Sequence, residues 1–208
     1  MRKYLLVVAA ALVALPTAAS AVKISKSERA SEGAPELLGI PVESLSAGIG
    51  YSNYTGEIAP DIAPGPGWDL RLDLDVTQPV ELEVQYMGAV NSVIPDPLSE
   101  FNLYTNQFQT AAQVAPWTVG DVEPYVSGGI GLTRVSVAKN PDLNAQIQSD
   151  TMGSVPLAAG ADYPITDALK IGARAQWDIY FDNELLVQEN TTDSDRWGFM
   201  VNIGATEF

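Results

Sequence analysis

The stretch "GWDLRLDLDVTQPVELEVQYMG", from Gly67 to Gly88, decides the fold of this chain. Nearly every second residue in it is apolar, and most of the residues between them are charged. A period of two is typical of a β-strand, because successive side chains of a strand point to opposite faces of the sheet. The stretch therefore predicts two strands of a hairpin that has one apolar face and one ionic face.

The same alternation recurs along the chain and predicts eight strands, at 44–54, 68–77, 80–90, 101–114, 122–137, 152–163, 168–181 and 196–208. The connections between them are alternately long and short. In an up-and-down sheet the long loops then share one end and the short turns share the other, as in an outer-membrane barrel. We therefore predict an all-β fold, an eight-stranded antiparallel up-and-down transmembrane β-barrel, over residues 44–208.

Glycine placement indicates which face lines the lumen. In "PYVSGGIGLTR" (Pro124 to Arg134), the apolar residues share one face, whereas serine, threonine and two glycines share the other. The lumen of an eight-stranded barrel is just wide enough for side chains to fill, so large residues there need small ones opposite. We predict that the polar face lines the lumen and that the apolar face meets lipid. A soluble lipocalin-like carrier, with its apolar face inside, is the alternative.

The N-terminus has the features of a secretory signal. Arg2 and Lys3 precede the apolar run Tyr4 to Leu15, and Ala19-Ser20-Ala21 fits the small-residue cleavage pattern. We expect a cleaved signal peptide at residues 1–21 and a flexible polar tail at residues 22–43.

Composition excludes several kinds of chemistry. The chain contains no cysteine and no histidine, so disulfides, thiol chemistry, the Ser-His-Asp triad and histidine metal sites are ruled out. Its formal net charge of −15 would become −17 once Arg2 and Lys3 are removed. So acidic a surface repels phosphates, and we expect no nucleic-acid partner. No cofactor, no metal site and no catalytic residues are predicted.

A cluster of charged side chains is predicted in the lumen. Its members are Asp69, Arg71, Asp73, Asp75, Glu81, Glu83, Lys170, Arg174 and Asp178. Facing residues of a hairpin must share a side, which excludes a two-residue loop at Gln78-Pro79 and requires a connection of three or five residues. With five, Asp75 faces Glu81 and Asp73 faces Glu83. The cluster is interpreted as a packed ionic network that fills a narrow barrel, rather than as a path for protons or cations.

Aromatic residues on the apolar face are expected to form girdles at the membrane–water interfaces. These are Trp68, Tyr86, Trp177, Phe181 and Trp197 towards the long loops and Tyr163 towards the short turns. The fourth long loop is acidic, with Glu184, Glu189, Asp193 and Asp195. Its carboxylates could bind Ca²⁺ or Mg²⁺, but a solvated loop is the preferred interpretation.

The chain resembles the outer-membrane β-barrel domain family, the small OmpA- and OmpW-like barrels of Gram-negative bacteria. The resemblance rests on "EPYVSGGIGLTR", "VPLAAGADYPITDALKIGARAQWDI" and "RWGFMVNIGATEF". It implies a location in the outer membrane, the lipid bilayer as partner, and Phe208 as a terminal signal for the assembly machinery. Phe208 has the parity opposite to the apolar face, which a bulge near Gly204 would correct.

Three functions fit the sequence. The preferred one is a non-enzymatic outer-membrane protein, expected to be a monomer, with a structural or surface-display role. A narrow channel for small solutes and the soluble carrier are the alternatives.

Overall fold

The computed structural model describes residues 35–77, 79–94, 101–137, 149–181, 185 and 194–206. Within these ranges the chain forms one short 3₁₀ helix, η2 (Gly56–Asp61), and nine strands. The strands are β1 (Glu36–Leu37), β2 (Ile40–Tyr54), β3 (Gly65–Thr77), β4 (Val80–Val93), β5 (Phe101–Val114), β6 (Glu123–Val137), β7 (Asp150–Pro164), β8 (Leu169–Phe181) and β9 (Arg196–Ala205). Strands β2 to β9 correspond one to one to the eight strands predicted from the sequence.

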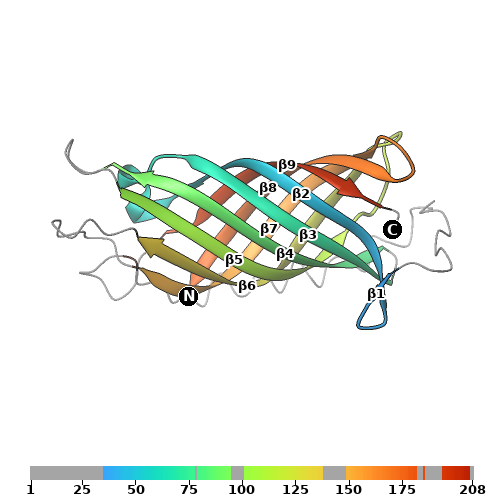
Figure 1. Ribbon diagram of the computed structural model, residues 1–208, viewed down its shortest axis with the longest axis horizontal. Coiled ribbons are helices and arrows are strands. Elements are labelled where there is room, and N and C mark those ends of the chain that lie inside the picture. Colours follow the sequence, from blue (N-terminus) through green and yellow to red (C-terminus); the bar gives the residue numbers. More distant parts are fainter. Residues whose placement is uncertain are drawn as a thin grey trace.

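Strands β2 to β9 close into an antiparallel barrel. Each strand pairs with the next one along the chain, and β2 also pairs with β9. Gly50 of β2, for example, lies opposite Gly67 on one side and opposite Met200 on the other. Closure leaves no free sheet edge along the barrel wall. The strands run obliquely around the barrel, with η2 at one end and β1 at the other (Figure 1).

The polar face lines the lumen, as predicted. Arg71, Asp73 and Glu83 are fully buried, whereas Ile49 and Ile130 keep 74% and 70% of their surface exposed. An apolar exterior around a polar interior is the reverse of a soluble carrier. The lipocalin-like alternative is therefore wrong.

Two lumen glycines show why small residues were needed on the polar face. Gly160 lies directly opposite Tyr125, and a methyl group at Gly160 would collide with the Tyr125 ring. A methyl group at Gly172 would collide with the Asp162 carboxylate. The glycines therefore leave the space that these large or charged side chains occupy.

The β3–β4 connection is shorter than the sequence argument allowed. Thr77 pairs directly with Val80, although Asp75 does face Glu81 and Asp73 does face Glu83. A register shift between Asp75 and Thr77 reconciles the two facts. The extra residue of a β-bulge restores the parity that a regular two-residue hairpin would break, so the exclusion of this loop length was wrong.

The last strand has no such irregularity. Gly204 and Ala205 pair in unbroken register with Lys170 and Leu169, so the bulge suggested near Gly204 is not present. Phe208 itself lies outside the described residues. Its role as an assembly signal stays a prediction.

Part of the predicted tail is ordered sheet. Strand β1 pairs with the start of β2, and β2 begins at Ile40 instead of Ser44. Leu38 and Gly39 both have positive φ, which is the geometry of a two-residue type I′ turn. Leucine seldom adopts positive φ, so Leu38 carries no turn signal in the sequence pattern. The tail boundary at residue 43 is corrected to precede β1, and the predicted signal peptide lies outside the described residues. No helix of the described part of the chain is long and apolar enough to cross a membrane.

Candidate functional site: the filled lumen

Four layers of side chains occupy the lumen, ordered along β8 from the short-turn end to the long-loop end. Lys170, Arg174, Asp178 and Tyr180 all point inwards from β8, and each belongs to one layer. The first three layers are ionic or strongly polar, and the fourth is apolar.

The first layer lies near the short turns. Lys170 Nζ is 2.9 Å from Asp162 and 3.4 Å from Asp73, and Arg71 also contacts both carboxylates. Asp73 accepts a further hydrogen bond of 2.6 Å from Ser44. Two cations thus share two anions across strands β3, β7 and β8. Asp73 and Asp162 can be buried close together because each of the two carboxylates contacts both cations.

The second layer is a paired arginine and glutamate at the middle of the lumen. Arg174 donates to both oxygens of Glu83, at 2.6 and 2.8 Å, and neither side chain is exposed. Tyr125 fills the adjoining space: its ring lies 5.2 Å from the Arg71 guanidinium and 5.9 Å from that of Arg174. Arg71 also donates to the Tyr125 hydroxyl at 2.7 Å. Fork geometry and flanking aromatic faces are the contacts that a buried arginine favours.

The third layer is centred on Arg196, the third arginine buried in the lumen. Arg196 donates to Asp178 at 2.9 and 3.1 Å and to Gln107 at 2.6 Å. Gln107 and Gln176 also donate to Asp178, at 2.9 and 2.7 Å. Gln109 continues this chain of amides towards Gln85, which in turn donates to Asp69. Amides from β4, β5 and β8 therefore connect the ion pairs across the barrel.

The fourth layer is an apolar plug at the long-loop end. Strands β2 and β4 to β8 contribute to it, together with η2, the residue that follows η2 and Leu185 after β8. Its members are Tyr54, Ile58, Ile62, Val93, Leu103, Val135, Val137, Met152, Tyr180 and Leu185. Backbone bonds hold the first loop in place, because Ala63 donates to Ser92 and Ile94 donates to Asp61. The lumen is thus closed by hydrophobic packing where the long loops begin.

The predicted cluster is largely brought together. Arg71, Asp73, Glu83, Lys170, Arg174 and Asp178 form ion pairs in the lumen, and Asp69 and Glu81 accept hydrogen bonds there from Gln85 and Gln113. Asp75 is half-buried near the short turns and makes none of the ion pairs found among the described residues.

Three central residues were missing from the predicted cluster. Asp162 and Arg196 complete the ion pairs of the first and third layers, and Tyr125 contacts Arg71 and Arg174 through its hydroxyl and its ring. Each one has the lumen parity of its strand, so the alternation pattern carried the signal. The prediction concentrated on the first hairpin and the seventh strand, where charges are densest in sequence.

The predicted aromatic residues lie on the outer surface. Trp68, Tyr86, Tyr163, Trp177 and Phe181 are exposed and Trp197 is half-exposed. Of the acidic fourth loop only Asp195 belongs to the described residues. It accepts a hydrogen bond of 3.1 Å from the Trp177 indole. Glu184, Glu189 and Asp193 lie outside those residues, and within the described ranges no three acidic side chains are grouped as a metal site requires.

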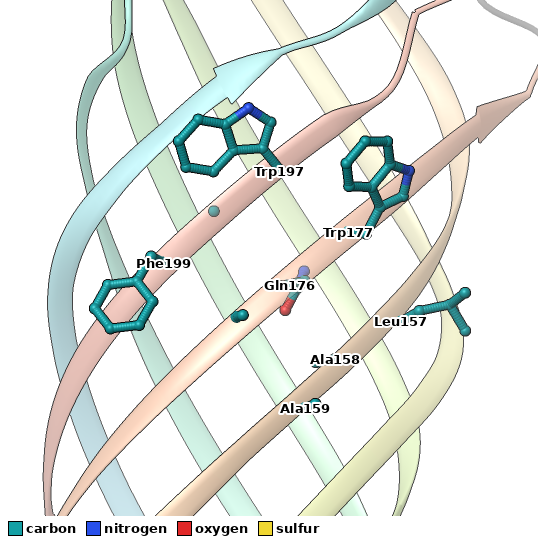
Figure 2. A pocket seen from close by; sticks show the side chains of 9 residues that line it. Leu157, Ala158, Ala159, Gln176, Trp177, Trp197 and Phe199 are labelled. Atoms are coloured by element: carbon teal, nitrogen blue, oxygen red, sulfur yellow. The ribbon is translucent and has the colours of Figure 1, made fainter.

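An open groove of about 660 Å³ lies on the outer wall over β7, β8 and β9. Trp177 and Trp197 border it towards the long-loop end, and Leu157 and Phe199 border its sides (Figure 2). Ala159 and Ala175 form part of its floor and face each other across the β7–β8 pair. Since none of its lining side chains ionises, the groove offers shape to an apolar chain and no acid–base chemistry.

A closed barrel with an apolar exterior and a polar, filled interior is a transmembrane β-barrel. Residues 6–204 match the model of the outer membrane protein beta-barrel domain family, and the chain belongs to that family. It is therefore an outer-membrane protein, and its exterior contacts the lipid bilayer.

Two solved structures are similar to this chain in fold. Neisserial surface protein A (NspA) is 17% identical, with a TM-score of 0.56 over 78% of this chain and 96% of that chain. Ail, the attachment invasion locus protein of Yersinia pestis, is 13% identical, with a TM-score of 0.52 over 78% of this chain and 95% of that chain. A comparison with curated protein sequences finds no match.

Proposed function

We propose that this protein is a structural, surface-displaying barrel of the outer membrane whose lumen does not conduct and does not catalyse a reaction. One observation carries the proposal: ion-paired and hydrogen-bonded side chains fill the lumen from the short-turn end, and the apolar plug fills it at the long-loop end. Water cannot form a continuous column through such packing. The barrel then serves to hold its long loops at the cell surface.

The ionic network supports a structural role. The buried cations of the interior, Arg71, Lys170, Arg174 and Arg196, each lie within 4 Å of a carboxylate. A conduction path needs sites that bind an ion weakly and release it, whereas these carboxylates already have protein cations as partners. The same pairing argues against catalysis, because a general acid or base needs access to a substrate.

The names of the two similar structures agree with a surface role but do not establish it here. NspA is named as a surface protein and Ail as an attachment invasion locus protein. At such low sequence identity the likeness concerns the fold. Assembly by the outer-membrane machinery and a monomeric state complete the proposal.

The runner-up function, a narrow channel, is tested by single-channel recording in a planar bilayer. We expect no steady openings of the wild type. The ionic layers and the apolar plug fill the lumen at different depths. Arg174→Ala removes a side chain from the ionic layers only, so this variant should show no openings either. Leu103→Ala/Arg174→Ala, which thins the plug as well, should raise the conductance. Large, steady, cation-selective openings of the wild type would overturn the proposal in favour of the channel.

A further inference from the structure

The groove over β7, β8 and β9 results from an abrupt change of side-chain size along the lipid face. A row of three large side chains crosses the three strands, and the next row towards the short turns contains two alanines. The first row is Leu157, Trp177 and Trp197, and the second is Ala159, Ala175 and Phe199. The alanines leave a hollow that the larger side chains border.

The shape of the groove suits one unbranched hydrocarbon chain. Trp197 and Phe199 lie on one side of it and Trp177 and Leu157 on the other (Figure 2). A chain in the groove is contacted from its floor and from both sides, whereas a smooth wall contacts a chain from one side only. Dispersion attraction grows with the number of neighbouring atoms, so an acyl chain is held more firmly here than on a smooth wall.

The long-loop end of the groove carries a negative charge. The Trp177 indole donates to one oxygen of Asp195 at 3.1 Å, and the backbone N–H of Tyr180 donates to the other at 3.3 Å. Asp195 takes part in none of the ion pairs that join described residues. The connection to which it belongs, residues 182–195, contains five acidic residues and neither lysine nor arginine. This end of the groove therefore attracts a cationic group and repels an anionic one.

We propose that the groove is a binding site for one phospholipid whose headgroup carries a primary ammonium, as phosphatidylethanolamine does. One acyl chain lies between the rings of the groove, and the ammonium donates a charge-assisted hydrogen bond to Asp195. The groove is continuous with the wall that contacts the bilayer, so the lipid enters it directly from its surroundings. The two parts of the site thus match the two parts of an amphiphile.

A second copy of the chain fits this surface less well. Two copies inserted in the same orientation and related by a two-fold axis bring the same patch of each against the other. Groove would then face groove, and the hollow would remain unfilled. The acidic long-loop ends would also approach each other, since both lie on the same side of the membrane.

Quenching by brominated lipids tests the proposal. The variant Trp68→Phe/Trp117→Phe retains only Trp177 and Trp197, which both border the groove. It is refolded into phosphatidylcholine vesicles that contain a small, equal fraction of one lipid with brominated acyl chains. We expect brominated phosphatidylethanolamine to quench the emission several-fold more than brominated phosphatidylcholine, and brominated phosphatidylglycerol to quench no more than phosphatidylcholine does. Equal quenching by the three lipids would overturn the proposal.

Two matched substitutions in the same background locate the acyl chain. Ala175→Leu fills the floor of the groove, whereas Ala173→Leu adds the same group on the same face of β8, outside the groove lining. Ala175→Leu should reduce quenching by phosphatidylethanolamine to the level of phosphatidylcholine, and Ala173→Leu should leave it unchanged. An equal effect of both would refute the groove as the site. Chemical cross-linking to a dimer that Ala175→Leu abolishes would assign the groove to a second copy instead.

A third substitution tests the headgroup contact without altering the groove. Asp195→Asn keeps an oxygen that accepts the Trp177 hydrogen bond but removes the charge. The difference in quenching between phosphatidylethanolamine and phosphatidylglycerol should then disappear. A difference as large as in the parent variant would refute Asp195 as the partner of the ammonium.

Discussion

Replacing Arg174 by methionine should destabilise the barrel strongly. The substitution keeps most of the side-chain volume but removes both hydrogen bonds to Glu83, at 2.6 and 2.8 Å, in a pair with no exposed surface. Glu83 then remains as a buried carboxylate without its cation. Loss of one partner of a buried ion pair costs about 3–5 kcal/mol. The folded-to-unfolded ratio should thus fall by a factor of about 10²–10⁴.

The double variant Arg174→Met/Glu83→Met separates the free energy lost by leaving Glu83 buried without a cation from the free energy that the ion pair itself contributes. In Arg174→Met/Glu83→Met both charges are absent, and apolar replacement of a buried pair is often neutral or stabilising by about 1–4 kcal/mol. We therefore expect the double variant to be more stable than Arg174→Met alone. The assay is reversible urea unfolding of the barrel refolded into lipid vesicles, followed by tryptophan fluorescence.

Arg134→Met is the matched control, because Arg134 is exposed on the outside of β6 and bonds only to Thr151 among the described residues. An exposed contact of this kind is worth about 0–1 kcal/mol. If Arg174→Met and Arg134→Met had equal unfolding midpoints, the claim that Glu83 depends on Arg174 for burial would be refuted. A double variant less stable than Arg174→Met would refute the claim that the orphaned charge causes the loss.

The remaining predictions concern the wall, the packing and the folded barrel. Ile130→Arg should lower the free energy of unfolding by ~2–4 kcal/mol in a vesicle refolding titration, because Ile130 lies on the lipid face near the middle of β6. Ser136→Arg, on the same face but near the long-loop end of β6, should change it little. Equal tolerance of the two variants would contradict the face assignment. Gly160→Ala should lower the free energy of unfolding in urea by about 1–3 kcal/mol, because the new methyl group meets the Tyr125 ring, and Gly160→Ala/Tyr125→Leu should recover part of the loss. A free energy of unfolding unchanged by Gly160→Ala would show that the lumen has spare room. Unboiled protein should migrate faster in gels than boiled protein and stay with the membrane fraction, and identical mobility would argue against a stable barrel.

Packing inside the lumen makes Gln176 a poor position for a control substitution to arginine. By its polarity alone, Gln176 is a position where arginine would be expected to do little harm. Gln176 is buried, however, and its amide nitrogen lies within hydrogen-bond distance of Gln109, Asp178 and Met87. A longer charged side chain has no space there, so overpacking should cost stability. Position 136 is therefore the better control for a lipid-face arginine.

Sequence patterns predicted the architecture because a barrel wall is built from local rules. Alternation assigns each strand and its two faces, and loop lengths assign the two ends of the barrel. The facing of Asp73 with Glu83 was also predicted, from parity together with an assumed five-residue connection. The turn that makes this facing possible did not follow, since a bulge adds one residue without any mark in the pattern.

Parity by itself determined the composition of the lumen and of the lipid face, because each residue of a strand has only two directions available. It could not determine which inward residues meet, because partners such as Arg174 and Glu83 lie 91 positions apart and are joined only when the barrel closes. Tyr125 and Asp162 acquired their roles in the same way, from strand tilt and register across the lumen. The apolar plug also depends on closure, since Ile58 and Leu185 come from loops that meet over the barrel end. Local chemistry thus determined the wall, and only the closed tertiary structure decided its contents.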